Sequence, residues 1–458
     1  MSEHRRSRLA GALGIGLGLS SVFAASLVVA QEPVPTTRPP APAAAEGGLQ
    51  LRDLIDRALQ TSPSQQVVDR GMSLAEAERV VTRASLMPQL GVAASQLRQT
   101  SNPAALGFQF PGIPSLIGPY SVFDARVSLS QTLFDLAKSS ELASAGFAVD
   151  AARAQVEVQR EQLATQVALA FIRVLAGEQA LVSAQTDLKL AEDLMVQARD
   201  QRTAGLASGV DVSRAETAVA QDRYAVSEAQ TSVAQARLQL QRLVGLPMGE
   251  PLQLAGQLQQ EAAALADAQQ VLSVARQDRA ELALLQAQLD QANEMRRAAK
   301  RRVYPTVSAF ADYGLSANEP GKNEEDTYRY GARVELPLYA GGAIRAGNAA
   351  AELQVEQQRL RLADLQEQVE QDVRLAVVTV ANTREQITAA DAAFEFAGRE
   401  LELTRDRFLN GIANNIDVVN AQANLARART QVVSAQAAHQ QARVNLAAAQ
   451  GHARQFKL

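Results

Sequence analysis

The stretch NGIANNIDVVNAQANLARAR, residues 410–429, closely resembles AGLASGVDVSRAETAVAQDR, residues 204–223. The two stretches align without a gap, and the alignment continues beyond them in the same register. Identical residues include the pairs Gly205 with Gly411, Asp211 with Asp417, and Gly245 with Gly451. An ungapped match that begins and ends on glycine indicates an internal duplication, and a duplication governs how the rest of the chain is interpreted.

Each copy of this motif predicts the tip of a helical hairpin. Gly205 and Gly411 are typical residues for ending a helix, because glycine tolerates the left-handed conformation that often follows a last helical turn. Serine or asparagine follows, which favours a new helix start. Asp211 and Asp417 then fall in the first turn, where a carboxylate is favoured by the helix dipole. Two long antiparallel helices therefore share each tip.

The duplication extends toward the N-terminus of each copy. Residues 51–90 align with residues 268–307, and Pro88 matches Pro305. A proline lacks a backbone N–H and biases the preceding residue toward extended structure. Each proline is therefore expected to end a helical stretch and to open a strand.

Four extended segments follow these prolines in two pairs. Apolar and polar residues alternate in YRYGARVELPL, VFDARVSLS and TVSAFADYGL, and more weakly in QLGVAASQL; these are residues 328–338, 122–130, 306–315 and 89–97. Period-two alternation predicts strands. A solvent-facing antiparallel sheet on a core would alternate in the same way, so this pattern alone does not require a membrane. The loops of the two expected hairpins span residues 100–120 and 316–328.

A very long helical run follows each hairpin. Residues from about 137 to 200 contain no proline, and Leu163, Val167 and Phe171 recur at helical spacing; the run from about 345 to 408 behaves likewise. At 1.5 Å per residue, each run is roughly 95 Å long. Helices of this length need partners along their length, so coiled-coil packing is expected. Each repeat is therefore predicted to contain, in order, a helix, two strands, a long helix, the hairpin tip and a second long helix.

Composition restricts the class of protein. The 458 residues carry a net charge of −4, with 21% charged residues, so no electrostatic feature favours nucleic acid as a partner. Aromatic residues are only 4%, which suits helices packed through Ala, Leu and Val. The chain has no cysteine, which excludes disulfides, thiolate metal ligands and a lipid-modified cysteine.

The N-terminus has the pattern of a signal peptide. A basic segment precedes the apolar stretch 9–30, which ends in small residues before Gln31. An uncleaved membrane anchor is the alternative. The predicted organisation is a signal peptide at 1–30, a Pro/Ala-rich linker at 31–48, repeats at 49–250 and 268–451, a connecting segment at 251–267, and a short tail at 452–458. No later stretch is expected to cross a membrane as a helix.

Four strands are too few to close a barrel, because small barrels need about eight or more. If the sheet spans a membrane, it must close, since open sheet edges cannot face lipid. Three copies would provide twelve strands and twelve long helices. Oligomerisation is therefore a physical requirement of the membrane interpretation.

The order and duplication of these segments resemble those of the TolC family of outer-membrane efflux channels. The resemblance rests on LRDLIDRALQTSP, on Pro88 and Pro305, on VELPLYAGG, and on GIANNIDVVNAQ, and it covers residues from about 49 to 451. It implies a mainly α fold with a β-barrel portion: a homotrimer with a 12-stranded barrel in the outer membrane of a Gram-negative bacterium and a 12-helix tunnel in the periplasm.

The resemblance also implies the function and the partners. Members of the family join a periplasmic membrane-fusion adaptor and an inner-membrane pump, of the resistance-nodulation-division or ATP-binding-cassette class. Solutes leave the cell through the shared conduit, with no reaction, cofactor or metal in the channel itself. The transported substrate is not indicated.

The resemblance further implies a periplasmic gate lined by acidic residues. The family pattern DVLDA corresponds here to DVVNA, so Asp417 keeps the first acid and Asn420 replaces the second. The first copy has Asp211 and Arg214 at these positions. Close carboxylates in a ring would attract cations, but Asn420 removes half of the expected acidic charge. Helix capping is the alternative role for both aspartates.

Two further groups of residues are implied by the resemblance. The hairpin tips would contact the adaptor through Gly205, Leu206, Gly411 and Ile412. The polar face of the strands would line the barrel lumen with Arg126, Arg333 and Glu335, although ordinary solvated strand residues are the alternative.

Other classes of protein fit less well. The few histidines, His4, His439 and His452, have no neighbouring ligands in the sequence, and no phosphate-binding loop is present, so an enzyme is not expected. The acidic run at 324–326 is expected to be a solvated extracellular loop. A periplasmic adaptor would need only one hairpin, and an extracellular coiled-coil structural protein would not explain the strands or the duplication.

Overall fold

The structure is a computed structural model that describes residues 48–102, 105, 107, 116–205, 207–258, 267–410, 412 and 414–458. The chain divides into two compact units, Met1–Glu46 and Gly47–Leu458, and the first lies outside the described residues. The predicted signal peptide and nearly all of the predicted linker therefore also lie outside them.

The predicted order of elements is present in both repeats. The first repeat contains α2 (Leu51–Thr61), α3 (Pro63–Ala84), β1 (Gln89–Ser101), β2 (Ile117–Phe134), α4 (Leu136–Thr203) and α5 (Gly209–Val244). The second contains α6 (Ala268–Asp278), α7 (Ala280–Arg301), β3 (Thr306–Ala317), β4 (Glu325–Glu335), α8 (Ala343–Leu409) and α9 (Asn415–Gln450), before a short 3-10 turn, Ala453–Gln455. Both repeats thus have the same succession of helices and strands.

One continuous helix before each hairpin was expected, and each is instead broken in two. Ser62 separates α2 from α3, and Arg279 separates α6 from α7, with extended backbone at both residues. Pro63 explains the first break, because proline disfavours helical backbone at the residue before it. The second break has no proline; there the Arg279 guanidinium holds Glu281 at 3.4 Å and Asp372 of α8 at 3.0 Å.

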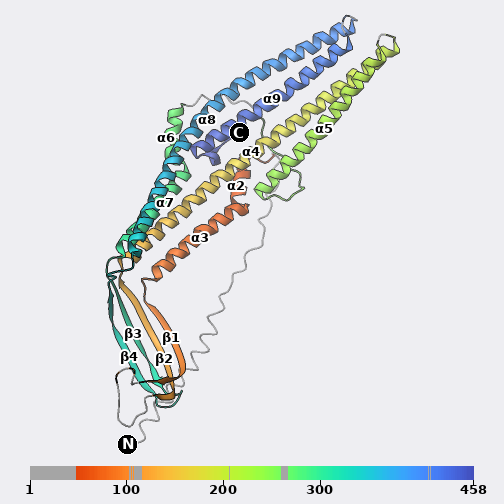
Figure 1. The fold of residues 1–458 in the computed structure, drawn as a ribbon. Coiled ribbons are helices and arrows are strands. Elements are labelled where there is room, and N and C mark those ends of the chain that lie inside the picture. The colour runs from red at the N-terminus through yellow and green to blue at the C-terminus, as the bar shows by residue number, and fades with distance from the viewer. Residues whose placement is uncertain are drawn as a thin grey trace. The chain divides into compact units, whose positions relative to one another are not determined.

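The four described strands form one antiparallel sheet in the order β1-β2-β3-β4 (Figure 1). The hairpin loops are shorter than expected, since β1 runs to Ser101 and β4 begins at Glu325. Two residues of the predicted acidic loop, Glu325 and Asp326, therefore belong to β4. Their charges are tolerated there because both side chains are exposed at the end of the strand.

The long helices pack along most of their length. The predicted positions Leu163, Val167 and Phe171 of α4 are fully buried, in a cluster with α2, α5 and α9. By length and composition α4 also contains a segment apolar enough to cross a membrane, contrary to expectation. Residues of α4 between Leu163 and Leu175 contribute to the largest hydrophobic core of the described residues, so packing inside the protein accounts for the apolar side chains there.

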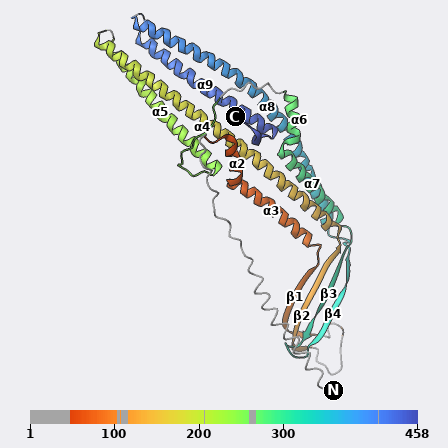
Figure 2. The same ribbon diagram turned by 180° about the vertical axis from the view of Figure 1, so that it is seen from behind.

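Within the unit Gly47–Leu458, the sheet lies at one end of the helices and both hairpin tips lie at the other (Figures 1 and 2). Next to the sheet the helices pack in the order α3, α4, α7, α8; toward the tips the order is α5, α4, α9, α8. In both halves α4 is central and α8 lies at one edge. The sheet continues this row, with β1 beneath α3 and β4 beneath α8.

Candidate functional site

One face of the sheet is apolar across all four strands. The register aligns Val92 with Val127, Val127 with Tyr313, and Tyr313 with Tyr328. A parallel row joins Leu90, Leu129, Ala311 and Tyr330. Nothing in the described chain covers this face, and Val92 and Tyr330 are each 78% exposed. A contiguous apolar surface of this kind requires an apolar partner, because isolated exposed residues are normal but a continuous patch is not.

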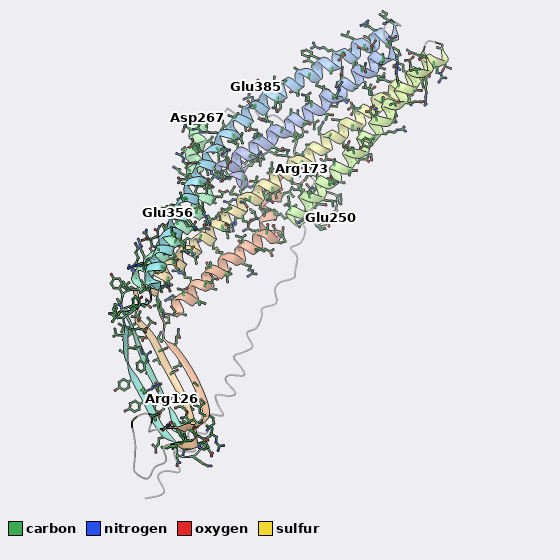
Figure 3. The ribbon with its side chains drawn as sticks, in the orientation of Figure 1. Arg126, Arg173, Glu250, Asp267, Glu356 and Glu385 are labelled. Atoms are coloured by element: carbon green, nitrogen blue, oxygen red, sulfur yellow. The ribbon has the colours of Figure 1, made fainter. Side chains whose placement is uncertain are left out.

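The opposite face is polar, and its centre is Arg126. Its guanidinium donates to Asp124 at 2.6 Å, to Asp312 at 2.7 Å and to Thr327 at 3.0 Å. Arg329 also contacts Asp312, at 3.0 Å. Charge-assisted hydrogen bonds of this length are among the stronger polar contacts in proteins. These bonds crosslink β2, β3 and β4 on one side of the sheet. Figure 3 labels Arg126 in the part of the sheet farther from the helices.

A glycine makes room for this cluster. A Cβ on Gly314 would lie 2.2 Å from the Ala125 carbonyl oxygen and 2.7 Å from Cγ of Arg126. No larger residue fits without displacing the strand, so Gly314 lets the arginine side chain cross β3 against the backbone.

The other predicted lumen residues lie on the same polar side. Arg333 pairs with Ser308 in the ladder, and its guanidinium lies 5.9 Å from the centre of the Phe310 ring. Glu335 is the last residue of β4 and pairs with Thr306. Both are nearer to the helices than Arg126. The polar face thus carries charged groups from Arg126 to its helix end at Glu335.

The first hairpin tip has a reciprocal capping box. The Ser208 hydroxyl accepts from the Asp211 backbone N–H, while the Asp211 carboxylate accepts from the Ser208 backbone N–H at 2.9 Å. The Ser208 hydrogen bonds, aided by Arg214 at 3.7 Å, hold the pKa of Asp211 below its usual range. The Asp211 carboxylate therefore caps the first turn of α5 and also lies beside the Arg214 guanidinium.

The second tip repeats this arrangement. Asn414 caps α9, and the Asp417 carboxylate accepts from the Asn414 backbone N–H at 3.3 Å. Asn420 follows on the same helix with an exposed side chain. A new contact joins the two tips, since the buried Asn415 side chain donates to the Asp211 carbonyl at 2.9 Å. The structure thus brings Asp211 and the start of α9 together.

The turn residues of the tips are only partly described. Gly205 adopts a left-handed conformation with a φ of 76°, as expected for a glycine that ends a helix. Ile412 is exposed, and its N–H donates to the Arg407 carbonyl at 2.8 Å. Leu206 and Gly411 lie outside the described residues.

A charged cluster that no sequence motif predicts lies farther along the same helices. Arg429 of α9 forms an ion pair with Asp187 of α4 and lies over the Phe394 ring of α8 at 5.7 Å. Gln422 of α9 donates to Asp222 of α5 at 3.4 Å. Burial raises the pKa of Asp187, and burial together with the nearby Asp187 charge raises the pKa of Asp222. No motif marks these residues, because they come from four separate helices.

The cavities of the described chain are open to solvent, and each is lined by both polar and apolar side chains. One of about 440 Å³ lies between α4, α7, α8 and α9 and is lined by Glu161, Arg279 and Asp372 among others. No group of three or more His, Asp or Glu side chains among the described residues is arranged to hold a metal ion.

Comparison with known proteins gives one consistent result. The sequence model of the family described as Outer membrane efflux protein matches residues 54–246 and 271–452. The probable efflux pump outer membrane protein TtgC of Pseudomonas putida is 24% identical over 83% of this chain and 78% of its own length. The pyoverdine export outer membrane protein OpmQ of Pseudomonas aeruginosa is 24% identical over 84% and 81%. The CmeC outer membrane channel of Campylobacter jejuni shares the fold, with a TM-score of 0.78, 16% identity, and coverage of 89% of this chain and 86% of that one.

Proposed function

The chain belongs to the outer membrane efflux protein family, the TolC family of channels, and on that premise we propose that three copies close into one conduit. The protein is the outer-membrane channel of an efflux or secretion system in a Gram-negative bacterium, and it extends into the periplasm. Closure by three copies would give a 12-stranded barrel above a tunnel of twelve long helices.

The two-sided sheet is the observation that carries this proposal. Its apolar face is exposed in all four strands, and the outer edges of β1 and β4 are unpaired within the described sheet. A lipid-facing barrel needs both an apolar outer surface and paired edges. Joining β1 of one copy to β4 of the next satisfies both requirements at once.

The helices at the two edges support the same closure. On α3, Val67, Leu74 and Val81 are exposed at intervals of seven residues; on α8, Leu353 and Leu360 repeat the spacing. A heptad of apolar residues is the pattern by which helices form coiled coils with a partner. Since α3 approaches the sheet and α8 leaves it, the two exposed stripes can pack antiparallel between neighbouring copies.

The positions of these residues support a particular pairing of α3 with α8 of the neighbouring copy. Leu74 lies ten residues before the end of α3, and Leu353 lies ten residues after the start of α8. The two side chains are therefore at similar heights above the sheet. Val67 and Leu360 are each seven residues farther from it, which supports a second contact in the same register.

The polar side of the sheet would line the lumen. Arg126, Arg333 and Glu335 lie on this side, away from the apolar face. At the other end, Asp417 and Asn420 with Asp211 and Arg214 would surround the periplasmic aperture, and Gly205, Leu206, Gly411 and Ile412 would meet the adaptor. The capping boxes support a gate in which the aspartates both shape the tips and carry charge. The inner-membrane pump, of either class named above, would select the cargo.

Engineered cysteines test the closure directly, because the chain has none of its own. We expect Leu74→Cys combined with Leu353→Cys to give a covalent trimer after oxidation of outer membranes. Leu74→Cys alone serves as one matched control and should run as a monomer on a denaturing gel. The pair Val67→Cys and Leu353→Cys, offset by about 10 Å along the helix, should crosslink poorly. A monomer in detergent, or release with the soluble periplasmic fraction, would refute the proposal.

A further inference from the structure

The end of α7 carries a dense run of basic residues beside the sheet. Five of the seven residues from 296 to 302 are cationic: Arg296, Arg297, Lys300, Arg301 and Arg302. The equivalent segment of the first repeat, 79–85, has only Arg79 and Arg83. Comparing the two repeats shows that the additional positive charge is present only in the second repeat.

The run is only partly neutralised by its neighbours. Lys300 contacts Glu352 of α8 at 2.8 Å, Arg302 contacts Glu141 of α4 at 3.4 Å, and Arg297 pairs with Glu294. The side chains of Arg297, Lys300 and Arg302 remain 53–60% exposed. Five cations thus face three carboxylates. The two cations in excess, Arg296 and Arg301, are half-buried, and Arg301 donates to the Ser140 hydroxyl at 2.7 Å. The segment 296–302 thus combines exposed cations with a positive surplus, and we call it the α7 basic run.

The α7 basic run lies where the polar helices meet the apolar sheet. Val303 and Tyr304 follow it directly and are exposed, before β3 begins at Thr306. Thr306 pairs with Glu335, so the segment after β4 lies alongside; in that segment Leu338 is 90% exposed and Tyr339 88%. Basic residues beside exposed tyrosine and leucine are characteristic of a membrane boundary, where aromatic rings and long cationic side chains meet the headgroups.

We propose that the α7 basic run binds the anionic headgroups of phospholipids in the periplasmic leaflet of the outer membrane. This inference rests on the proposed function, because it requires the sheet to span the bilayer. The rest of α7 would extend into the periplasm, so the cations at its sheet end would lie at the level of that leaflet. Juxtamembrane cations attract anionic lipid, and one lysine or arginine near such a surface changes binding about fivefold.

Native mass spectrometry of the detergent-purified protein tests the inference, because it reports the trimer and its bound lipids together. The probes are phosphatidylglycerol, phosphatidylethanolamine and inorganic phosphate at equal concentration. The variant replaces the three most exposed cations, Arg297→Gln, Lys300→Gln and Arg302→Gln. A control with the same loss of charge replaces Arg361, Arg405 and Arg407 of α8 by Gln. These three positions lie farther from the sheet along α8.

We expect the wild-type trimer to retain phosphatidylglycerol over phosphatidylethanolamine, and inorganic phosphate not to displace it. The α7 variant should lose at least tenfold in phosphatidylglycerol retention, while the control keeps it. Equal retention by variant and wild type would overturn the inference, and would leave the cations as partners of Glu141, Glu352 and the helix C-terminus. Displacement by inorganic phosphate would assign the run to free anions instead. An altered ion selectivity in planar bilayers with no lipid preference would assign it to the lumen. If the wild type shows no trimer, the proposed function fails instead.

Discussion

The side-chain amide of Asn415, at the start of α9, donates a hydrogen bond of 2.9 Å to the backbone carbonyl of Asp211, at the start of α5. Asn415 is buried, and this bond joins the two hairpin tips of one protomer. Each tip is internally capped by its own aspartate, Asp211 or Asp417. The two capped tips therefore form one connected unit rather than two independent ends.

Replacing Asn415 by Ala should loosen this unit. The variant removes one hydrogen bond between the tips, and the net loss for one such bond is about 1 kcal/mol. If the tips surround the aperture, single-channel conductance in planar bilayers should rise. Thr430→Ala on the same helix removes an exposed hydroxyl that bonds only within α9, so it should leave conductance unchanged. Equal conductance of wild type and Asn415→Ala would argue against a role of this contact in closure.

Two variants of Asp417 separate its capping role from its charge. Asp417→Asn removes the negative charge but can still accept the Asn414 N–H bond, whereas Asp417→Ala removes both. A gate ring predicts reduced block by multivalent cations in both variants, because the carboxylates attract cations. Loss of the cap should lower stability only in Asp417→Ala, by about 1 kcal/mol, seen in thermal unfolding. Unchanged cation block and conductance in both variants would leave Asp417 with the capping role alone.

The ion pair between Arg429 and Asp187 predicts a strong effect on stability. Arg429→Met leaves the largely buried Asp187 without its cation and near Asp222, and should cost about 3 kcal/mol. The double variant Arg429→Met with Asp187→Leu should recover most of this loss, since no buried charge then remains unpaired. Thermal unfolding of the wild type, of the single variants Arg429→Met and Asp187→Leu, and of the double variant gives the coupling energy between the two side chains. A double variant as unstable as the single one would show that packing, not charge, dominates there.

The pH dependence of Arg429→Met follows from the same burial. Burial already raises the pKa of Asp187 above its ordinary value of 3.8 in the wild type, and removing Arg429 raises it further. A group with a raised pKa costs no stability below the unfolded value and costs progressively more as pH rises through the folded value. The deficit of the variant relative to wild type should therefore shrink as pH falls toward 4.

His439 should make stability sensitive to mild acid. It is buried in α9 against Thr383 of α8, with 3.1 Å between Nδ1 and Oγ1. Burial, together with the charges of Arg443 and Arg384, lowers the pKa of His439 from its ordinary 6.5. Stability from the neutral ring is full above pH 6.5 and is lost as pH falls toward the folded pKa. The unfolding temperature should thus fall from pH 7.5 to pH 5.5.

Two variants test this assignment. His439→Gln should flatten the pH dependence, because glutamine can replace the hydrogen bond without gaining charge. His452→Gln should retain the dependence, since His452 lies elsewhere, beside Asp278. A wild type whose unfolding temperature is the same at both pH values would contradict the prediction.

The hairpin tips and the buried side of α4 could be predicted from residues that are close together in the sequence. The duplicated motif predicted both tips, because Gly205 favours a left-handed helix end and Ser208 with Asp211 can form a capping box within four residues. The helical spacing of Leu163, Val167 and Phe171 predicted the buried side of α4. Signals of this kind act between residues close in the chain, so the sequence displays them directly. The family resemblance added what no spacing shows, the outer-membrane channel.

Only the tertiary structure revealed contacts between distant segments. Arg126 with Asp312, Asn415 with Asp211, and Arg429 with Asp187 each join residues from different elements. At the break at Arg279, where there is no proline, the guanidinium likewise contacts Asp372 of another helix. Such pairs depend on helix register and strand order, which are set by the packing of the whole chain. The sequence by itself therefore determined the helices, the strands and their duplication. Only the tertiary structure decided which charged side chains form ion pairs, because these pairs form between segments that are distant in the chain and meet only in the folded backbone.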